Sequence, residues 1–204
     1  MRNPVIFNET CAKNETYWEE FYKNPFTLEP SDFARFCLGR LTHRSKIIEL
    51  GSGNGRDAYF LAERHQVYGV DRAVKPPSEG NPVFIQEDLD VFFAKRDQKF
   101  DGVYARFLLH AIERELADSL IEWAYESLYP GGLLMIDARS TNDDSFVADH
   151  YRRPVERAEL LKQLKEIGFY IAYFKEGNGM AVFNGQDPVV VRVIAGKKIV
   201  KIEG

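Results

Sequence analysis

Residues 46–57, with the sequence KIIELGSGNGRD, limit the possible folds of this chain more than any other stretch. The first five of them are mainly apolar, with two adjacent isoleucines, as is typical of a buried parallel strand. Gly51, Gly53 and Gly55 follow, and residues 56–64 then place apolar and charged side chains on opposite faces of an expected helix. Glycines let a ligand approach the backbone closely, and the first N–H groups of a helix are free to bind it. The stretch therefore predicts a strand, a loop and a helix arranged to hold a ligand.

The next acidic residue along the chain indicates that this ligand contains a ribose. A second strand is predicted over residues 66–70, and it ends in Asp71, about twenty residues after Gly51. A carboxylate at that distance can accept hydrogen bonds from both ribose hydroxyls. The glycines are spaced G-x-G-x-G, whereas a dinucleotide-binding loop has G-x-G-x-x-G, and Arg56 stands where that loop has its final glycine. The spacing therefore argues against a dinucleotide.

Glu49, two residues before the first glycine, completes a known motif. The stretch resembles motif I of the class I S-adenosylmethionine-dependent methyltransferases, (D/E)-x-G-x-G-x-G, and the resemblance covers roughly residues 30–198. A carboxylate at the mouth of the loop suits a cofactor with an ammonium and a sulfonium, and it would repel a pyrophosphate. The resemblance implies S-adenosyl-L-methionine as cofactor and S-adenosyl-L-homocysteine as product, with no metal. An NAD(P)-dependent oxidoreductase and a non-catalytic S-adenosylmethionine-binding module are the alternatives.

The resemblance also assigns residues to the cofactor. Asp88 follows the third predicted strand, residues 83–85, at the position where this family commonly binds the adenine amino group, with Leu89 against the ring. Asp88 could instead only cap a helix over residues 89–96. The full set of cofactor candidates is Glu49, Gly51, Gly53, Asn54, Gly55, Arg56, Asp71, Arg72, Asp88, Leu89 and Ala105.

The order of the remaining elements predicts the fold class. Strands are expected over residues 100–105, 133–138, 169–174 and 188–195, with a helix over 113–128 and a tight turn at 130–132. A further helix starts at Pro154, faces the core with Val155, Ala158, Leu161, Leu164 and Ile167, and is closed by Gly168. This order, with the resemblance, predicts an α/β fold: a three-layer, seven-stranded, mostly parallel, Rossmann-like sheet with an antiparallel last strand.

The whole chain is expected to be one methyltransferase domain, residues 1–204, with a core at 45–198 and an N-terminal helical lid segment at 1–44. Helices are predicted over residues 14–22 and from Pro30 to about Leu41. Their aromatic side chains, including Tyr17, Trp18 and Phe21, either pack in the core or keep water from the reacting methyl group.

Composition narrows the partners and the compartment. The net charge of −4 and the lack of any Lys/Arg run make nucleic acid an unlikely partner. Cys11 and Cys37 lack metal-ligand spacing and are expected to be free thiols in a reducing cytosol. No apolar run is long enough to span a membrane, so a cytoplasmic location is expected.

Polar residues that follow strands four and five are the acceptor candidates: Arg106, His110, Arg139, His150, Tyr151 and Arg152. In doubly wound sheets the ligand lies at the carboxyl ends of the strands, and guanidinium groups bind carboxylates or phosphates in pairs of hydrogen bonds. These residues therefore predict a small, polar, anionic acceptor, such as a phosphorylated or acidic sugar, that is methylated on oxygen. In the competing interpretation each arginine pairs with a nearby acid: Asp137, Asp143, Asp144 or Glu156.

Two further comparisons concern the acceptor. N-methyltransferases that act on DNA or on protein glutamine are expected to carry an Asn/Asp-Pro-Pro-aromatic tetrad after strand four. This chain has Ala-Arg-Phe-Leu there, which argues against such an activity. The segments EPSDFARF, GNGRD, YARFLLHAI, DARS and HYRRP together resemble a bacterial subgroup associated with surface polysaccharide biosynthesis. The expected acceptor is a small molecule or a glycan precursor, and this resemblance does not fix its identity.

Overall fold

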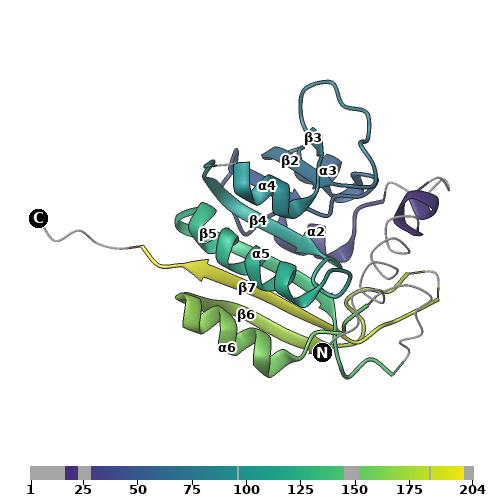
Figure 1. Cartoon of the computed structure of the whole chain (residues 1–204), viewed down its shortest axis with the longest axis vertical. Helices are drawn as coiled ribbons and strands as arrows, with labels where there is room; N and C mark the ends of the chain where they lie inside the picture. The colour runs from purple at the N-terminus through teal and green to yellow at the C-terminus, as the bar shows by residue number, and fades with distance from the viewer. Residues whose placement is uncertain (1–16, 23–28, 96, 145–151, 184, 200–204) are drawn as a thin grey trace, which may run out of the picture.

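A seven-stranded sheet with the strand order β3-β2-β1-β4-β5-β7-β6 forms the middle of the molecule (Figure 1). The computed structural model describes residues 17–22, 29–95, 97–144, 152–183 and 185–199. Neighbouring strands are parallel from β3 to β5, and β7 is antiparallel to both β5 and β6. The predicted fold class is confirmed. The strands are β1 (Lys46–Leu50), β2 (Gln66–Asp71), β3 (Val83–Gln86), β4 (Phe100–Arg106), β5 (Leu128–Arg139), β6 (Phe169–Gly177) and β7 (Val190–Lys197).

Helices cover both faces of the sheet and make the fold three-layered. In Figure 1, α4 (Leu89–Lys95), α5 (Arg114–Ser127) and α6 (Arg157–Ile167) lie on one face, and α2 (Asp32–Cys37) and α3 (Arg56–Leu61) on the other. Two hydrophobic clusters correspond to these faces, and alternate residues of one strand join different clusters: Val103 packs under α5, whereas Tyr104 packs with α2 and α3. The core is therefore divided by the sheet.

The structure corrects the turn predicted at residues 130–132 and the bounds of the strands predicted after it. The turn predicted at residues 130–132 is wrong, because β5 already starts at Leu128 and passes through Gly131, whose φ is +87°. Its pairing with β4 shifts between Phe100 and Gly102, so the glycine accommodates a strand irregularity. β6 also extends to Gly177, and β7 covers Val190–Lys197.

The helix predicted from Pro154 begins later, at Arg157, because the Glu156 side chain caps it by accepting the N–H of Glu159. Ala158 is exposed rather than inside, and Leu160 takes the buried position. Gly168 ends the helix in the left-handed conformation, as predicted.

Several elements end earlier than predicted. α2 stops at Cys37 and α3 at Leu61. The segment 17–22 is helical, and the first residues of the helix predicted from Asn14 lie outside the described residues.

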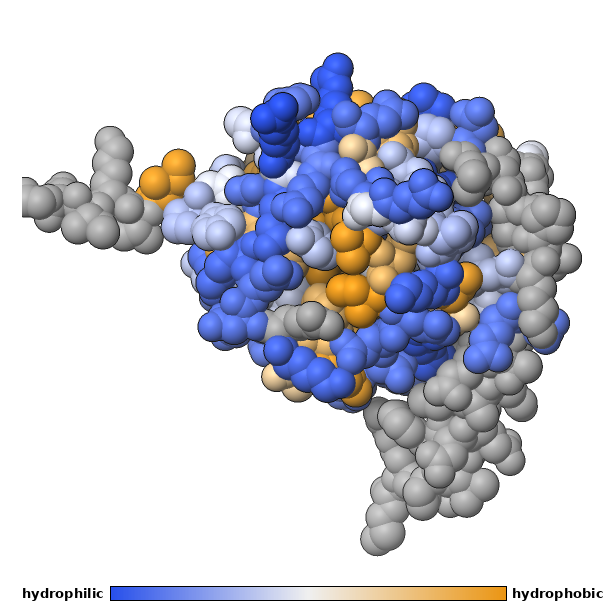
Figure 2. All heavy atoms as spheres, turned by 90° about the horizontal axis from the view of Figure 1, so that it is seen from above, coloured by the Kyte–Doolittle hydropathy of each residue, from blue (hydrophilic) through white to orange (hydrophobic). Residues whose placement is uncertain are grey.

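The parallel strands β1, β2, β4 and β5 all end at one edge of the sheet, which we call the ligand edge. The helix of residues 17–22 lies beside this edge (Figure 1). Elsewhere the surface is mainly hydrophilic, although Figure 2 shows an apolar area within the polar surface of one face. Within the described part of the chain, no helix is long and apolar enough to cross a bilayer.

Candidate active site

The loop after β1 depends on glycine for its backbone conformation. Gly51, Gly53 and Gly55 have φ angles of +71°, +51° and +79°, in the left-handed region that other residues rarely adopt. The N–H groups of Gly51 and Ser52 both donate to the carbonyl of Val70, at 2.8 and 3.1 Å. The loop therefore turns back over the end of β2, and α3 starts directly after it.

Asp71 ties this loop to β2. One carboxylate oxygen accepts the N–H of Gly53 at 2.9 Å, and the other accepts the N–H of Ala73 at 2.8 Å. Burial raises the pKa of Asp71, and the hydrogen bonds from backbone N–H groups counteract part of that rise. Each carboxylate oxygen can accept more than one hydrogen bond, so Asp71 holds the loop and still has acceptor capacity for a ligand.

Glu49 places a second carboxyl group beneath the loop. Its side chain is buried, and its Oε2 atom has no hydrogen-bond partner among the described residues. Burial is the main cause that raises the pKa of Glu49 well above its usual value, followed by the negative charge of Asp57, while Arg106 and Arg56 lower it. A buried carboxyl oxygen without a partner is costly unless something else satisfies it, and a cationic ligand group would do so.

A pocket of about 300 Å³ opens beside the end of β2. It is lined by Glu19 and Tyr22 from the N-terminal helix and by Ala73 and Val74 from the chain after Asp71. This volume lies at the lower end of the range of small-molecule sites. The space therefore adjoins the carboxylate that was predicted to bind a ribose.

The remaining cofactor candidates lie around the glycine loop and the end of β2. Asp88, at the end of β3, is exposed and lies 3.9 Å from the guanidinium of Arg72, and Leu89 is half-buried against the core. The backbone carbonyl of Asp88 accepts the N–H of Phe92 at the start of α4. Ala105 is fully buried in the core, so only its backbone can face a ligand.

Asn54 and Arg56 sit at the start of α3. The Asn54 side chain accepts the N–H of Arg56 at 3.4 Å. The Arg56 guanidinium lies 3.8 Å from Asp57 and 5.7 Å from the centre of the Phe183 ring, in the connection between β6 and β7. Burial and the positive charge of Arg106 lower the pKa of Arg56. Arg56, from the start of α3, and Arg106, from the end of β4, are therefore within electrostatic range of each other at this part of the ligand edge.

Arg106 ends β4 without an acidic partner among the described residues. Its guanidinium lies 4.2 Å from the centre of the Phe107 ring, and its buried Nε atom makes no hydrogen bond. Phe107 has a φ of +54°, an uncommon conformation for a bulky residue that is often held at functional sites. The chain after β4 is thus strained where it leaves the sheet.

His110 is used within the fold. It is 2% exposed, its Nδ1 atom accepts the N–H of Arg139 at 3.1 Å, and its carbonyl accepts the N–H of Arg153 at 2.8 Å. His150 and Tyr151 lie outside the described residues, and Arg152 is half-buried. His110 therefore joins β5 to the segment that leads into α6.

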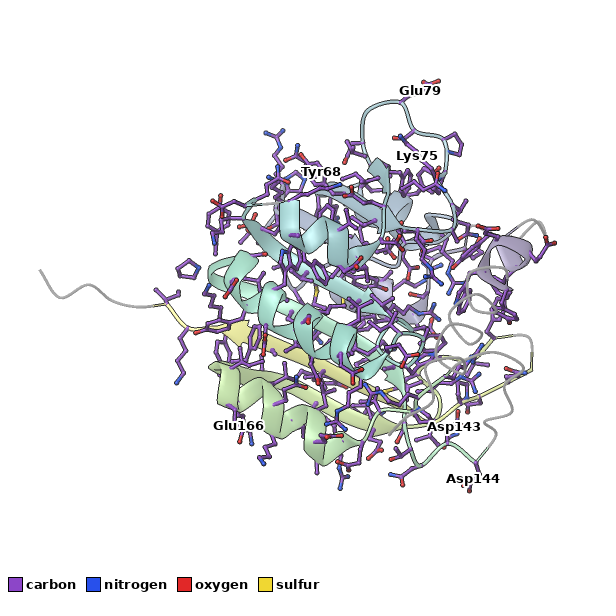
Figure 3. All side chains as sticks on the ribbon, in the orientation of Figure 1. Tyr68, Lys75, Glu79, Asp143, Asp144 and Glu166 are labelled. Carbon is purple, nitrogen blue, oxygen red and sulfur yellow. The ribbon has the colours of Figure 1, made fainter. Side chains whose placement is uncertain are left out.

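Arg139 differs from Arg106 because its charge is neutralised. Its side chain is buried, donates to Asp143 at 3.1 Å and lies 3.4 Å from the side-chain oxygen of Gln186. Asp143 lies on the chain just beyond β5 (Figure 3). For Arg139, the interpretation that an arginine pairs with a nearby acid is therefore confirmed. Asp137 is paired as well, through two hydrogen bonds of 3.1 Å from Arg192.

Sequence reasoning missed a buried hydrogen-bond cluster beneath the glycine loop. Asp57, only 3% exposed, accepts the N–H and the hydroxyl of Ser31 at 2.8 and 2.7 Å and the hydroxyl of Tyr104 at 2.7 Å. An acid in the first turn of a helix is usually a surface residue, so Asp57 gave no signal. Tyr104 in an otherwise apolar strand was the available clue, because a buried hydroxyl needs a partner.

Comparison with protein families and solved structures agrees with this arrangement. A family model described as a methyltransferase domain matches residues 21–176. No curated protein sequence matches the chain significantly.

Similar folds are found among solved methyltransferases. The 1,6-didemethyltoxoflavin-N1-methyltransferase of Burkholderia thailandensis, solved with its substrate and S-adenosylhomocysteine, is 16% identical, with a TM-score of 0.72 over 98% of this chain and 92% of that one. A S-adenosylmethionine-dependent methyltransferase from Methanosarcina mazei is 17% identical, with a TM-score of 0.63 over 78% and 95%. The magnesium protoporphyrin IX methyltransferase of Synechocystis, solved with S-adenosylmethionine, is 15% identical, with a TM-score of 0.58 over 92% and 81%. At such identities the likeness establishes the fold alone.

Proposed function

We propose that this chain, which belongs to the class I S-adenosylmethionine-dependent methyltransferases, transfers the methyl group to an oxygen of a small, polar, anionic acceptor. S-adenosylmethionine is the cofactor of the family, and its sulfonium supplies an electrophilic methyl carbon. The observation that carries the proposal about the acceptor is the guanidinium of Arg106 at the end of β4, which has no acidic partner among the described residues.

The residues at the ligand edge fit the cofactor. Asp71 keeps acceptor capacity for the ribose hydroxyls beside the 300 Å³ pocket. Glu49 offers to the ammonium group a buried oxygen that has no hydrogen-bond partner among the described residues. Asp88 is exposed next to Arg72 and so is available to the adenine amino group. The glycine loop turns over the end of β2 at the same place, with the N–H groups of Gly51, Ser52 and Gly53 bonded within the protein.

Charge at the acceptor side favours an anion. Arg139 is neutralised by Asp143, whereas Arg106 has no acidic partner among the described residues and lies within electrostatic range of a second guanidinium, that of Arg56. An anionic ligand would relieve the repulsion between these two cations, as a carboxylate or phosphate does between paired arginines.

An acceptor that is already anionic also needs no general base. His110 is buried and uses Nδ1 as an acceptor within the fold, which leaves it poorly placed to take a proton from a hydroxyl. Orientation and exclusion of water would then carry most of the rate acceleration. A phosphorylated or acidic sugar, as a glycan precursor, has the required chemistry.

The test compares Arg106→Ala with Arg114→Ala, a control on the exposed face of α5. Methyl transfer from labelled S-adenosylmethionine is measured on sugar phosphates, uronic acids and their neutral parent sugars. We expect anionic sugars alone to be methylated, and Arg106→Ala to raise the acceptor KM at least about 30-fold, the loss of a buried charged contact.

In both variants the affinity for S-adenosylhomocysteine should stay within about 3-fold of that of the unchanged protein, since the proposal assigns Arg106 to the acceptor. Equal activity on neutral sugars, or an acceptor KM that Arg106→Ala leaves unchanged, would refute the anionic acceptor.

A further inference from the structure

Tyr22 reaches the glycine loop from the N-terminal helix. A Cβ atom built on Gly53 would collide with both the hydroxyl and the ring of Tyr22. The space that glycine leaves at this position is therefore occupied by the chain's own tyrosine. A substitution at Gly53 would have to push Tyr22 away.

The hydroxyl of Tyr22 lies where the two halves of the site meet. Burial raises the pKa of Tyr22, and the negative charges of Asp71 and then Glu49 raise it further, while Arg56 and Arg106 lower it. The hydroxyl is therefore protonated at neutral pH and able both to donate and to accept a hydrogen bond. Both cofactor carboxylates and both arginines lie within electrostatic range of one hydroxyl.

The ring of Tyr22 forms a wall of the pocket at the end of β2. With Glu19 it faces Ala73 and Val74 across the 300 Å³ space. Two neighbours on its own helix contact the ring. The Trp18 ring stacks on it with 6.1 Å between the ring centres, and the Phe21 ring meets it edge-on with 5.3 Å between the ring centres. Tyr22 thus belongs to a small aromatic cluster, and its own ring is the member of that cluster that lines the pocket.

We propose that Tyr22 is a cofactor-binding residue: its ring closes the adenosyl pocket against water, and its hydroxyl bonds to the cofactor beside Gly53. The inference rests on the cofactor placement proposed above. An aromatic ring over the cofactor excludes water from the methyl carbon. A hydroxyl beside Gly53 and within electrostatic range of Glu49 and Asp71 can bond to either the ribose or the amino acid end. Nothing in the glycine motif indicates this residue.

Calorimetric titration with S-adenosylhomocysteine tests the assignment. Tyr22→Phe keeps the ring and should weaken binding about 3- to 10-fold, the effect of one hydrogen bond. Tyr22→Ala removes the wall as well and should weaken binding at least about 30-fold. The matched control is Tyr17→Phe, which removes a hydroxyl on the same helix but keeps the ring that stacks on Phe21, and its expected change is below about 2-fold.

Trp18 provides a readout that a purely structural role of Tyr22 would not affect. Because Trp18 stacks on Tyr22, S-adenosylhomocysteine should change tryptophan fluorescence, and Trp18→Phe should abolish the change while Trp123 remains in the core. In Tyr22→Phe the fluorescence change should persist at a higher ligand concentration.

The outcomes separate this inference from the cofactor placement on which it rests. If Asp71→Ala binds S-adenosylhomocysteine as well as the unchanged protein does, the placement itself is wrong. If Asp71→Ala loses affinity but Tyr22→Ala binds equally well or more tightly, Tyr22 only fills the space and the inference is overturned. Tyr22→Phe, which differs by one oxygen atom, guards against a folding defect in Tyr22→Ala.

Discussion

Glu49 couples the stability of the fold to pH through a single buried carboxyl group. Its raised pKa means that the native protein keeps the proton at pH values where the unfolded chain has lost it. The stability contributed by protonated Glu49 is complete below the unfolded pKa of about 4.3 and is lost as the pH rises through the native pKa. Ionisation of Glu49 is therefore a cost to the stability of the ligand-free protein.

We predict that Glu49→Gln raises the thermal midpoint relative to the unchanged protein by an amount that grows between pH 5 and pH 8. The amide has a similar shape and no charge to bury, so it avoids the cost of ionisation. Calorimetric melting at four pH values measures the difference, and Glu63→Gln, at an exposed position, is the control. A difference that is constant with pH would contradict the raised pKa.

At the scale of elements, the Asp57 cluster joins α2, α3 and β4. Ser31 caps α2 through its hydroxyl and also donates to Asp57 at the start of α3, and Tyr104 donates to the same carboxylate from β4. A hydrogen bond to a charged acceptor contributes about 1.5 to 3 kcal/mol. The cluster therefore fixes where α3 begins, and with it the end of the glycine loop.

We predict that Tyr104→Phe lowers the free energy of unfolding by about 1.5 to 3 kcal/mol, because Asp57 loses one of its three donors. Urea unfolding measures the loss. Tyr68→Phe, on β2 (Figure 3), is the matched control because the Tyr68 hydroxyl makes no hydrogen bond with the described residues. Equal stability of the two variants would show that the Tyr104 bond contributes nothing net.

The elements around the site were predictable where one local pattern decides the structure. Buried parallel strands and a glycine loop leave few alternatives, so β1, β2 and the end of β4 were predicted within a residue or so. The start of α6 was not, because Val155 forms an isolated bridge with Ser140, a contact between distant segments that takes precedence over the helix signal at Pro154. The roles of three further residues could not be predicted for the same reason, because these roles arise only when separate elements meet: Asp57, Tyr22 and Phe107.

At the scale of the whole molecule, cofactor binding should be visible as stability. A ligand that binds only the native state stabilises it by about 2.7 kcal/mol at one hundred times its Kd. For a chain of 204 residues this corresponds to a rise in thermal midpoint of about 5 to 10 °C. The division into an N-terminal segment at 1–44 and a core at 45–198 stays a prediction.

We therefore predict that S-adenosylhomocysteine raises the melting temperature by that amount and that NADH does not. The G-x-G-x-G spacing with Arg56 disfavours a pyrophosphate, which is the physical reason for the difference. Differential scanning fluorimetry at a saturating concentration of each ligand measures it. A shift with NADH and none with S-adenosylhomocysteine would favour the oxidoreductase instead.

The reversed direction of β7 has a practical consequence for measuring any of these affinities. Because β7 runs against β5, it ends at Lys197 on the side of the sheet away from the glycine loop (Figure 1). A tether attached beyond this strand would hold the protein on a sensor surface with its pocket turned toward the flowing solution. A tether placed before the helix of residues 17–22 would instead crowd the entrance that Tyr22 and Glu19 border.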